Sequence, residues 1–201
     1  VKDGVIVGIG TGYSARTYRD VAGRIILPGF MDAHIHVEGT MLTPEEFARL
    51  TVPHGTSLIV ADPHELVNVC GIAGAEYVAE AFARLQREGV SPLEVLLQLP
   101  SCVPATPFET SGARLDGRAT AEELEKPTFF GLGEMMNYVG VIAGDAETLE
   151  KLEAAKHLKK VADGHAPGVV GDALNAYLCA GVTTDHESVS AQEIAEKIAR
   201  G

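Results

Sequence analysis

Residues 25–36 read IILPGFMDAHIH, an apolar run that ends in two histidines, and this stretch decides the fold. An unbroken run of apolar residues is typical of a strand buried on both faces of a parallel sheet. Side chains two residues apart on a strand share one face, so His34 and His36 point the same way. We therefore expect a buried strand over Ile25–His36 whose end presents two imidazoles.

The same strand pattern recurs along the chain, with helical patterns between the strands. Further strands are expected at Thr56–Ala61, Glu94–Leu99, Thr128–Glu134, Lys160–Gly164 and Val182–Asp185. Helices are expected at Pro44–Val52, Leu66–Glu88, Ala146–Leu158, Val170–Ala180 and Ala191–Arg200. This alternation predicts an α/β fold. We interpret residues 25–201 as a (β/α) barrel with about six of its eight units. Residues 1–24, with short β-branched stretches and glycines, are interpreted as part of a small N-terminal β domain.

Polar side chains gather where the predicted strands end, which is the edge at which parallel α/β folds build their sites. Beyond the first histidine pair, the candidates at these ends are Asp62, His64, Glu65, Cys102, Glu134, His165, His186 and Glu187. Five of the seven histidines lie at strand ends, whereas a random placement would scatter them over the helices as well. The pattern therefore indicates a site at this edge.

The histidines and Glu134 predict a metal centre. Sets of three or four imidazoles suit borderline divalent metals. A carboxylate that follows an apolar strand is desolvated unless it is paired, so a metal is the natural partner of Glu134. Placed between His34 and His36 on one side and His165 and His186 on the other, it could bridge two ions that share a hydroxide. The alternative is a set of solvated or separately hydrogen-bonded side chains.

Several other classes of protein are disfavoured. The net charge of −12 argues against a phosphate backbone as partner. No apolar run reaches the roughly 18 residues that span a bilayer. HExxH, PCxxC and GxSxG motifs are absent, and the GIGTG string at 8–12 lacks the third glycine and the helix of a dinucleotide site. Three widely spaced cysteines fit a reducing cytoplasm.

The string PGFMDAHIH at 28–36 resembles the opening barrel strand of the amidohydrolase superfamily. Further strings resemble, within it, the adenine deaminases of bacteria and archaea: DPHE at 62–65, PSCVPAT at 100–106, GEMMN at 133–137, DGHAPG at 163–168 and DHE at 185–187. The histidine pair indicates only the superfamily, whereas the first three of these strings together are specific to the family. The resemblance runs from end to end of the chain.

The resemblance implies hydrolytic deamination of adenine to hypoxanthine and ammonia with two divalent ions, manganese or iron being typical and zinc possible. His34 and His36 would bind one ion, His165 and His186 the other, and Glu134 would bridge them where many relatives use a modified lysine. The catalytic set is thus Glu134, His165 and His186. A bridging hydroxide would attack C6 of the purine, and a nearby acid must protonate the leaving amine.

In the superfamily this acid and base is an aspartate at the end of the eighth strand. We therefore expect the chain to be an N-terminal fragment that lacks it, and Asp185 is not assigned this role. We call the strand-end edge of the barrel its mouth. Residues at the mouth are expected to contact substrate or to orient the metal ligands, although such residues can instead form turns and helix caps. They are Glu38, Asp62, His64, Glu65, Cys102 and Glu187.

Two other functions stay open. One is another binuclear amidohydrolase, acting on a cyclic amide or an N-acyl group. The other is a metal-binding fragment without turnover, because an open barrel lacking two strands exposes apolar surface. For the full-length protein we expect a homo-oligomer in the cytoplasm that binds adenine, with no nucleic acid or membrane as partner.

Overall fold

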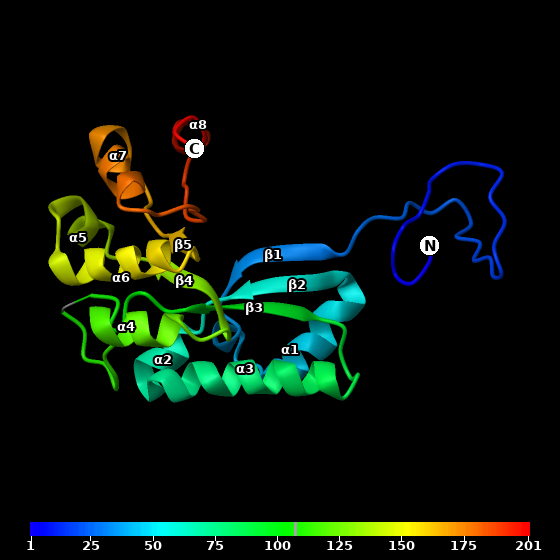
Figure 1. Cartoon of the computed structure of the whole chain (residues 1–201), viewed down its shortest axis with the longest axis horizontal. Coiled ribbons are helices and arrows are strands. Elements are labelled where there is room, and N and C mark those ends of the chain that lie inside the picture. Colours follow the sequence, from blue (N-terminus) through cyan, green and yellow to red (C-terminus); the bar gives the residue numbers. More distant parts are fainter. Residues whose placement is uncertain (107) are drawn as a thin grey trace.

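The structure, a computed structural model, describes residues 1–106 and 108–201, which form one parallel sheet with helices packed on it (Figure 1). The strands are β1 (Phe30–Ile35), β2 (Thr56–Ala61), β3 (Glu94–Leu99), β4 (Phe129–Met135) and β5 (Val161–Gly164). They lie in sequence order, and every neighbouring pair is parallel. The sheet curls into part of a (β/α) barrel, so the predicted fold class is confirmed.

Helical segments make the crossovers that parallel neighbours require. They are η1 (Glu38–Thr40), α1 (Pro44–Thr51), η2 (Val52–His54), α2 (His64–Cys70), α3 (Ile72–Arg87), α4 (Gly117–Leu124), α5 (Tyr138–Ala143), α6 (Ala146–His157), α7 (Gly171–Cys179) and α8 (Ala191–Ile198). The predicted helix over Leu66–Glu88 is divided at Gly71, whose φ of 65° ends α2 and starts α3. Among the described residues, none of these helices has the length and apolar character needed to cross a membrane.

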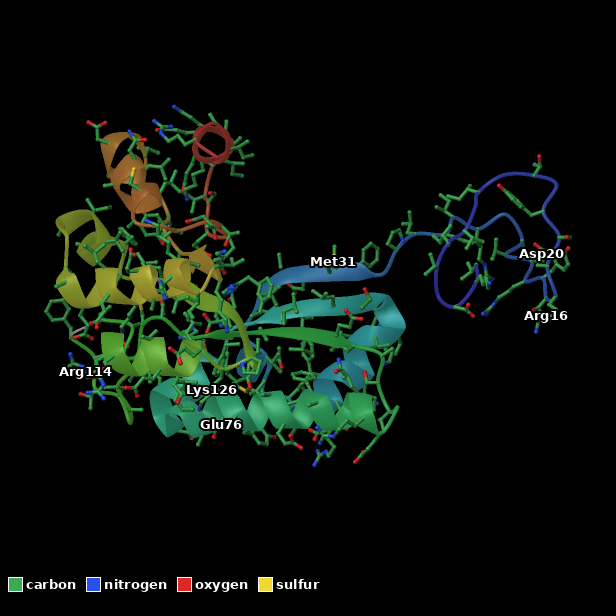
Figure 2. All side chains as sticks on the ribbon, in the orientation of Figure 1. Arg16, Asp20, Met31, Glu76, Arg114 and Lys126 are labelled. Carbon is green, nitrogen blue, oxygen red and sulfur yellow. The ribbon has the colours of Figure 1, made fainter. Side chains whose placement is uncertain are left out.

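The first strand is shorter than predicted. It begins at Phe30, whose N–H donates to the carbonyl of Gly55 at 2.8 Å, and not at Ile25. Ile25 and Ile26 are exposed because they lie before the point where β2 can pair with them. Figure 2 shows the outward-facing Met31 on β1 and, well away from the sheet, Arg16 and Asp20.

Residues 1–29 run away from the sheet toward the N-terminus (Figure 1). Their described secondary structure is a single isolated bridge between Lys2 and Val5. The assignment of residues 1–24 to a small β domain therefore stays a prediction.

The sixth predicted strand, Val182–Asp185, is not formed as a strand. The segment lies beside β5, where the backbone N–H of Thr183 donates to the carbonyl of Ala162 at 2.9 Å. The hydroxyl of Thr183 also accepts from the N–H of Ala162 at 3.2 Å. The Thr183 hydroxyl thus takes the N–H of Ala162, which the backbone carbonyl of a sixth strand would otherwise accept. The parallel hydrogen-bond ladder therefore does not continue beyond β5.

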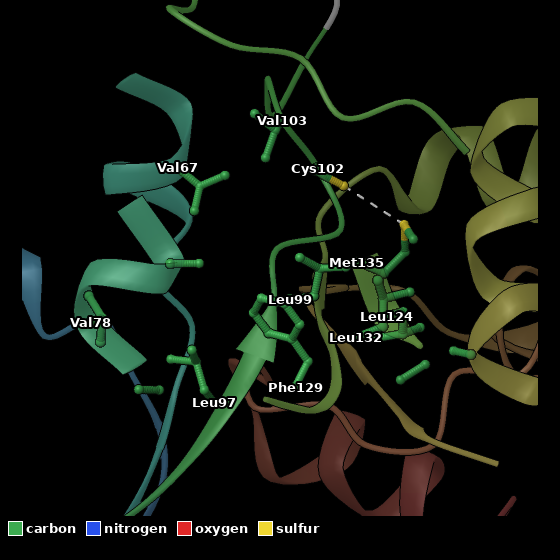
Figure 3. Close-up of a cluster of buried hydrophobic side chains, with 14 of the residues drawn as sticks. Val67, Val78, Leu97, Leu99, Cys102, Val103, Leu124, Phe129, Leu132 and Met135 are labelled. Carbon is green, nitrogen blue, oxygen red and sulfur yellow. Dashed lines mark hydrogen bonds between the residues drawn. The ribbon is translucent and has the colours of Figure 1, made fainter. Parts of the chain in front are cut away.

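The core lies between the sheet and the helices that cover its outer face. Figure 3 shows Leu97 and Leu99 of β3 packed with Phe129 and Leu132 of β4, and Leu124 of α4 closes the cluster. All five are nearly fully buried. Each such side chain contributes about 1.5–3 kcal/mol relative to exposure, so this cluster holds β3 and β4 in register beneath the strand ends.

Candidate metal centre

The carboxyl ends of β1, β4 and β5, and the segments after β2 and β5, meet at one edge of the sheet. The strand pairing aligns Ile35 with Ala61 and Met135 with Gly164, which brings the next residues along each strand together. The result is a cluster of histidines and carboxylates at this edge: His34, His36, Asp62, His64, Glu134, Asp163, His165 and His186.

Glu134 is the centre of the cluster, and its carboxylate is only 4% exposed. Its Oε1 atom lies 3.4 Å from Nε2 of His36 and 3.3 Å from Nε2 of His64. Its Oε2 atom lies 2.8 Å from Nδ1 of His165 and 3.1 Å from Nε2 of His186. Oε1 therefore faces His36 and His64, whereas Oε2 faces His165 and His186 and lies 3.8 Å from Nε2 of His34.

Hydrogen bonds at Nδ1 set the orientation of the first histidine pair. Nδ1 of His36 donates to the backbone carbonyl of Asp62 at 2.7 Å, and Nδ1 of His34 donates to Asp163 at 2.8 Å. Each ring is then left with a lone pair on Nε2, and the two Nε2 atoms lie 3.2 Å apart. Two facing lone pairs repel unless a proton or a cation lies between them, so this arrangement fits a bound cation.

The donor atoms divide into sets that suit metal binding. The ligand atoms of His34, His36 and Glu134 all lie within 4.8 Å of one another, and so do those of Glu134, His165 and His186. Nδ1 of His165 is buried and has no hydrogen-bond partner in the described structure, although Glu134 is adjacent. Imidazole and carboxylate donors of this kind suit divalent first-row metals. The residues present therefore fit the predicted metal centre.

The charges of these groups shift one another's pKa. Burial alone would raise the pKa of Glu134, but His165 and His186 lower it below its usual range. The Glu134 carboxylate raises the pKa of His165. Burial alone would lower the pKa of His186, but the carboxylates of Asp163 and Glu134 raise it to about 10. Without a metal, the cluster therefore holds protons in the positions where cations would bind.

Asp62 supports Glu134 from beneath. Its side chain is fully buried, and Oδ2 accepts the backbone N–H of Glu134 at 2.9 Å. Burial, and after it the charge of Glu134, raises the pKa of Asp62 well above its usual range. The residue was predicted to lie at the mouth, and the structure places it under the cluster, where it fixes the backbone of the central carboxylate.

The close approach of Asp62 requires glycine at 133. A Cβ there would overlap Oδ2 of Asp62. We expect Gly133→Ala to lower the free energy of unfolding by about 1–3 kcal/mol, as overpacking does in buried sites. The matched control is Gly39→Ala, whose Cβ would meet Oε2 of Glu65 at 3.5 Å, an ordinary contact. Urea denaturation of both variants measures the difference, and equal midpoints would contradict the prediction.

Two further residues at this edge were missed by the sequence analysis. Oδ2 of Asp163 contacts Nδ1 of His34 at 2.8 Å and Nδ1 of His186 at 3.2 Å. The hydroxyl of Tyr177 accepts the N–H of His165 at 3.1 Å and donates to the carbonyl of Met135 at 2.9 Å. A carboxylate on the short apolar strand before His165 was the available signal for Asp163. For Tyr177, on α7, the sequence pattern offers none.

The predicted orienting residues Glu38 and Glu187, and the predicted mouth residue Glu65, lie outside the cluster. Oε1 of Glu38 accepts the N–H groups of Glu65 and Leu66 at 3.2 and 3.3 Å, so it caps the first turn of α2. Burial raises the pKa of Glu38. The side chains of Glu65 and Glu187 are exposed. Glu38 thus positions the helix that starts with His64.

Cys102 is buried beside the end of β4. Its Sγ donates to Sδ of Met135 at 3.8 Å (Figure 3) and lies 3.2 Å from the hydroxyl oxygen of Ser101. Burial raises the pKa of the thiol, which keeps it protonated. The Ser101 hydroxyl also donates to the backbone carbonyl of Glu134. This loop therefore contacts the centre through the backbone of Glu134.

Comparison with known proteins agrees with this geometry. The sequence model of the amidohydrolase family matches residues 25–200. "Adenine deaminase 2" of Desulfotalea psychrophila is 50% identical over 205 residues, covering 100% of the chain and 34% of that relative. "Adenine deaminase" of Nitratidesulfovibrio vulgaris strain DP4 is 48% identical over 182 residues, with 90% of the chain and 31% of the relative covered.

A third relative, "Adenine deaminase" of Halalkalibacterium halodurans, is 46% identical over 204 residues, covering 100% of the chain and 34% of the relative. The chain thus spans about a third of the length of the curated relatives it matches. The family match covers most of the barrel segment, including every histidine of the cluster. The chain therefore belongs to the amidohydrolase family.

Proposed function

We propose that the chain forms the metal centre of an adenine deaminase, which hydrolyses adenine to hypoxanthine and ammonia. The observation that carries this proposal is the buried Glu134, whose two oxygens face two groups of histidines, in a chain about half identical to proteins named adenine deaminase. The family match supports divalent metal binding. We propose two ions, manganese or iron, with zinc as a further option.

In this proposal His34 and His36 hold one ion, His165 and His186 hold the other, and Glu134 is shared. When bound, such a pair of ions lowers the pKa of water toward neutrality and so supplies the nucleophile for C6 of the purine. The chain's own residues hold this geometry: Nδ1 of His36 is fixed by the carbonyl of Asp62 at 2.7 Å. The Glu134 carboxylate itself is 4% exposed and so is shielded from bulk water.

His64 is proposed as a substrate contact. Its Nε2 lies 3.3 Å from Oε1 of Glu134, and its Nδ1 is buried with no hydrogen-bond partner in the described structure. Burial and the neighbouring His36 lower the pKa of His64, so it is a neutral imidazole at physiological pH. With Nε2–H directed at the Glu134 carboxylate, Nδ1 is the nitrogen left to accept from the exocyclic amine of the purine.

The remaining mouth residues have lesser proposed roles. Asp62 and Glu38 position Glu134 and α2 respectively, through the hydrogen bonds described above. The remaining candidates are proposed to orient the substrate or the residues that contact it. They are Glu65, Cys102 and Glu187.

Asp185 is not proposed as the proton carrier. Its Oδ1 accepts from Nζ of Lys197 at 2.9 Å, and its Oδ2 accepts the N–H of Ala166 at 3.0 Å. These hydrogen bonds tie the carboxylate to Lys197 of α8 and to the backbone of Ala166. The leaving amine therefore needs an acid outside these residues. We propose that the full-length protein supplies it, acts on adenine as a cytoplasmic homo-oligomer, and binds neither nucleic acid nor membrane.

The test is an adenine assay on manganese-loaded full-length protein. We expect loss of the ultraviolet adenine signal with one hypoxanthine and one ammonia formed per adenine. Cyclic amides and N-acyl amino acids are the comparison substrates. Hydrolysis of one of these without any turnover of adenine would contradict the proposal and favour another amidohydrolase activity. The 201-residue chain assayed in parallel is expected to bind metal with negligible turnover.

A further inference from the structure

Asp163 lies at the end of β5 with its side chain 5% exposed, and it contacts histidines from both halves of the centre. Its Oδ2 atom accepts from Nδ1 of His34 at 2.8 Å and from Nδ1 of His186 at 3.2 Å. The two rings stack, with centroids 3.6 Å apart and planes inclined by 15°. A single carboxylate oxygen therefore orients two imidazoles that face Glu134 from different strand ends.

The other oxygen of Asp163 is fixed by separate partners. Oδ1 accepts from the hydroxyl of Thr184 at 2.6 Å and from the N–H of Gly164 at 2.9 Å. The carboxylate therefore cannot rotate without breaking several hydrogen bonds. An immobile acceptor is thus presented to both Nδ1 atoms.

We propose, on the basis of the metal centre proposed above, that Asp163 is a positioning residue that couples the two halves of the centre. By accepting from Nδ1 it holds each ring in the tautomer that leaves Nε2 free for an ion. Because the same oxygen serves His34 and His186, a change at Asp163 affects both ions. Loss of this carboxylate is therefore expected to weaken the binding of both ions.

The competing arrangement makes Asp163 itself a ligand. The ligand atoms of His34, Asp163 and His186 also lie within 4.8 Å of one another, so an ion could in principle bind between them. The two arrangements differ in which ring nitrogen contacts the ion. In the proposed one, Nδ1 keeps its proton and Nε2 binds, whereas in the competing one Nδ1 binds.

The first experiment is 15N NMR of the histidine rings in the full chain loaded with zinc, which is diamagnetic. We expect His34 and His186 to show a protonated Nδ1 and a zinc-bound Nε2. Zinc bound at Nδ1 of either ring would overturn the proposal. This measurement uses the unaltered chain, so it remains decisive if a variant fails to fold.

The second experiment compares Asp163→Asn with the matched control Asp185→Asn. Asp185 is also a low-exposure aspartate beside β5, with 12% exposure, but its hydrogen-bond partners are Lys197 and backbone amides. We expect Asp163→Asn to weaken zinc binding about 10–100-fold at both sites, as loss of an outer carboxylate does. The control is expected to keep both affinities.

Zinc titration by calorimetry and metal content after dialysis give the readout. Loss of one ion with the other unchanged, or unchanged binding of both, would overturn the coupling role of Asp163. If the unaltered chain itself fails to bind two ions, the proposed metal centre is wrong, which is a different outcome. Thermal melting of each metal-free variant shows that folding is intact.

Discussion

Replacing Glu134 by glutamine is expected to abolish the proposed paired metal binding and, in the full-length protein, the proposed adenine turnover, and this is the largest effect we expect. Both oxygens of Glu134 face histidines, and the carboxylate is nearly completely buried. An amide offers one weak acceptor and adds an NH₂ donor directed at the imidazoles. Loss of an outer carboxylate alone weakens metal binding about 10–100-fold. Loss of the shared inner one should exceed about 100-fold.

The measurement is metal content by mass spectrometry after dialysis, together with kcat for adenine. Glu153→Gln on α6 is the control, because Glu153 is exposed and on the outer side of the barrel. We expect the control to keep its metal and its kcat. Retention of two ions by Glu134→Gln would show that the histidines alone hold them, and the shared role of Glu134 would be wrong.

Metal binding is expected to stabilise the chain strongly and to depend on pH. An ion at about 1,000 times its dissociation constant adds about 4 kcal/mol to the free energy of unfolding. For a chain of this size that corresponds to roughly 8–16 °C in Tm. The pKa of His186 is raised to about 10 in the metal-free protein, so at neutral pH a proton must leave before the ion binds.

Metal binding releases protons, so the apparent metal affinity falls as the pH falls. Each proton released makes the apparent metal affinity fall about tenfold for every pH unit of acidification. Zinc titrations between pH 6 and 8 in a non-chelating buffer measure the slope, and thermal melts with and without chelator measure the stabilisation. A chelator-insensitive Tm, or an affinity that rises on acidification, would contradict the prediction.

Much of the fold could be read from local patterns. β2 and β3 begin and end where the apolar runs predicted, because both strands have paired neighbours on each side. The predicted strand at Ile25 failed since a β-branched run alone does not supply a pairing partner. The ladder at Val182–Asp185 failed because the Thr183 hydroxyl competes for the donor of Ala162.

Short helices were harder to predict. α4 and α5 were missed, although Asp116 and Asn137 accept N–H groups of their first turns at 2.8 and 3.0 Å. Such caps are common in turns as well, and each helix is too short to show a clear apolar period. Each packs on a neighbouring helix: α4 lies beside α6 over the outer face of the sheet (Figure 1), and α5 contacts α7.

For the candidate site as well, local patterns pointed to some residues, whereas others depend on tertiary contacts. The histidines and Glu134 were found because strand-end spacing places them on one edge. Asp163 was overlooked since its role depends on which ring nitrogen it faces, and that is fixed only when β5 lies beside the segment carrying His186. Whether Glu38 orients a ligand or a helix likewise depended on the distance to α2, which no local pattern contains.

The hydroxyl of Tyr177 has a consequence for interpreting sequence variants of this chain. It joins the carbonyl of Met135 to the N–H of His165, yet it belongs to α7, and Tyr177 lies twelve residues beyond His165 in the chain. A tyrosine-to-phenylalanine change there would be scored as conservative and remote from any histidine. Studies of sequence variants should therefore include α7 together with the strand ends, because the Tyr177 hydroxyl bonds the end of β4 and the residue that follows β5.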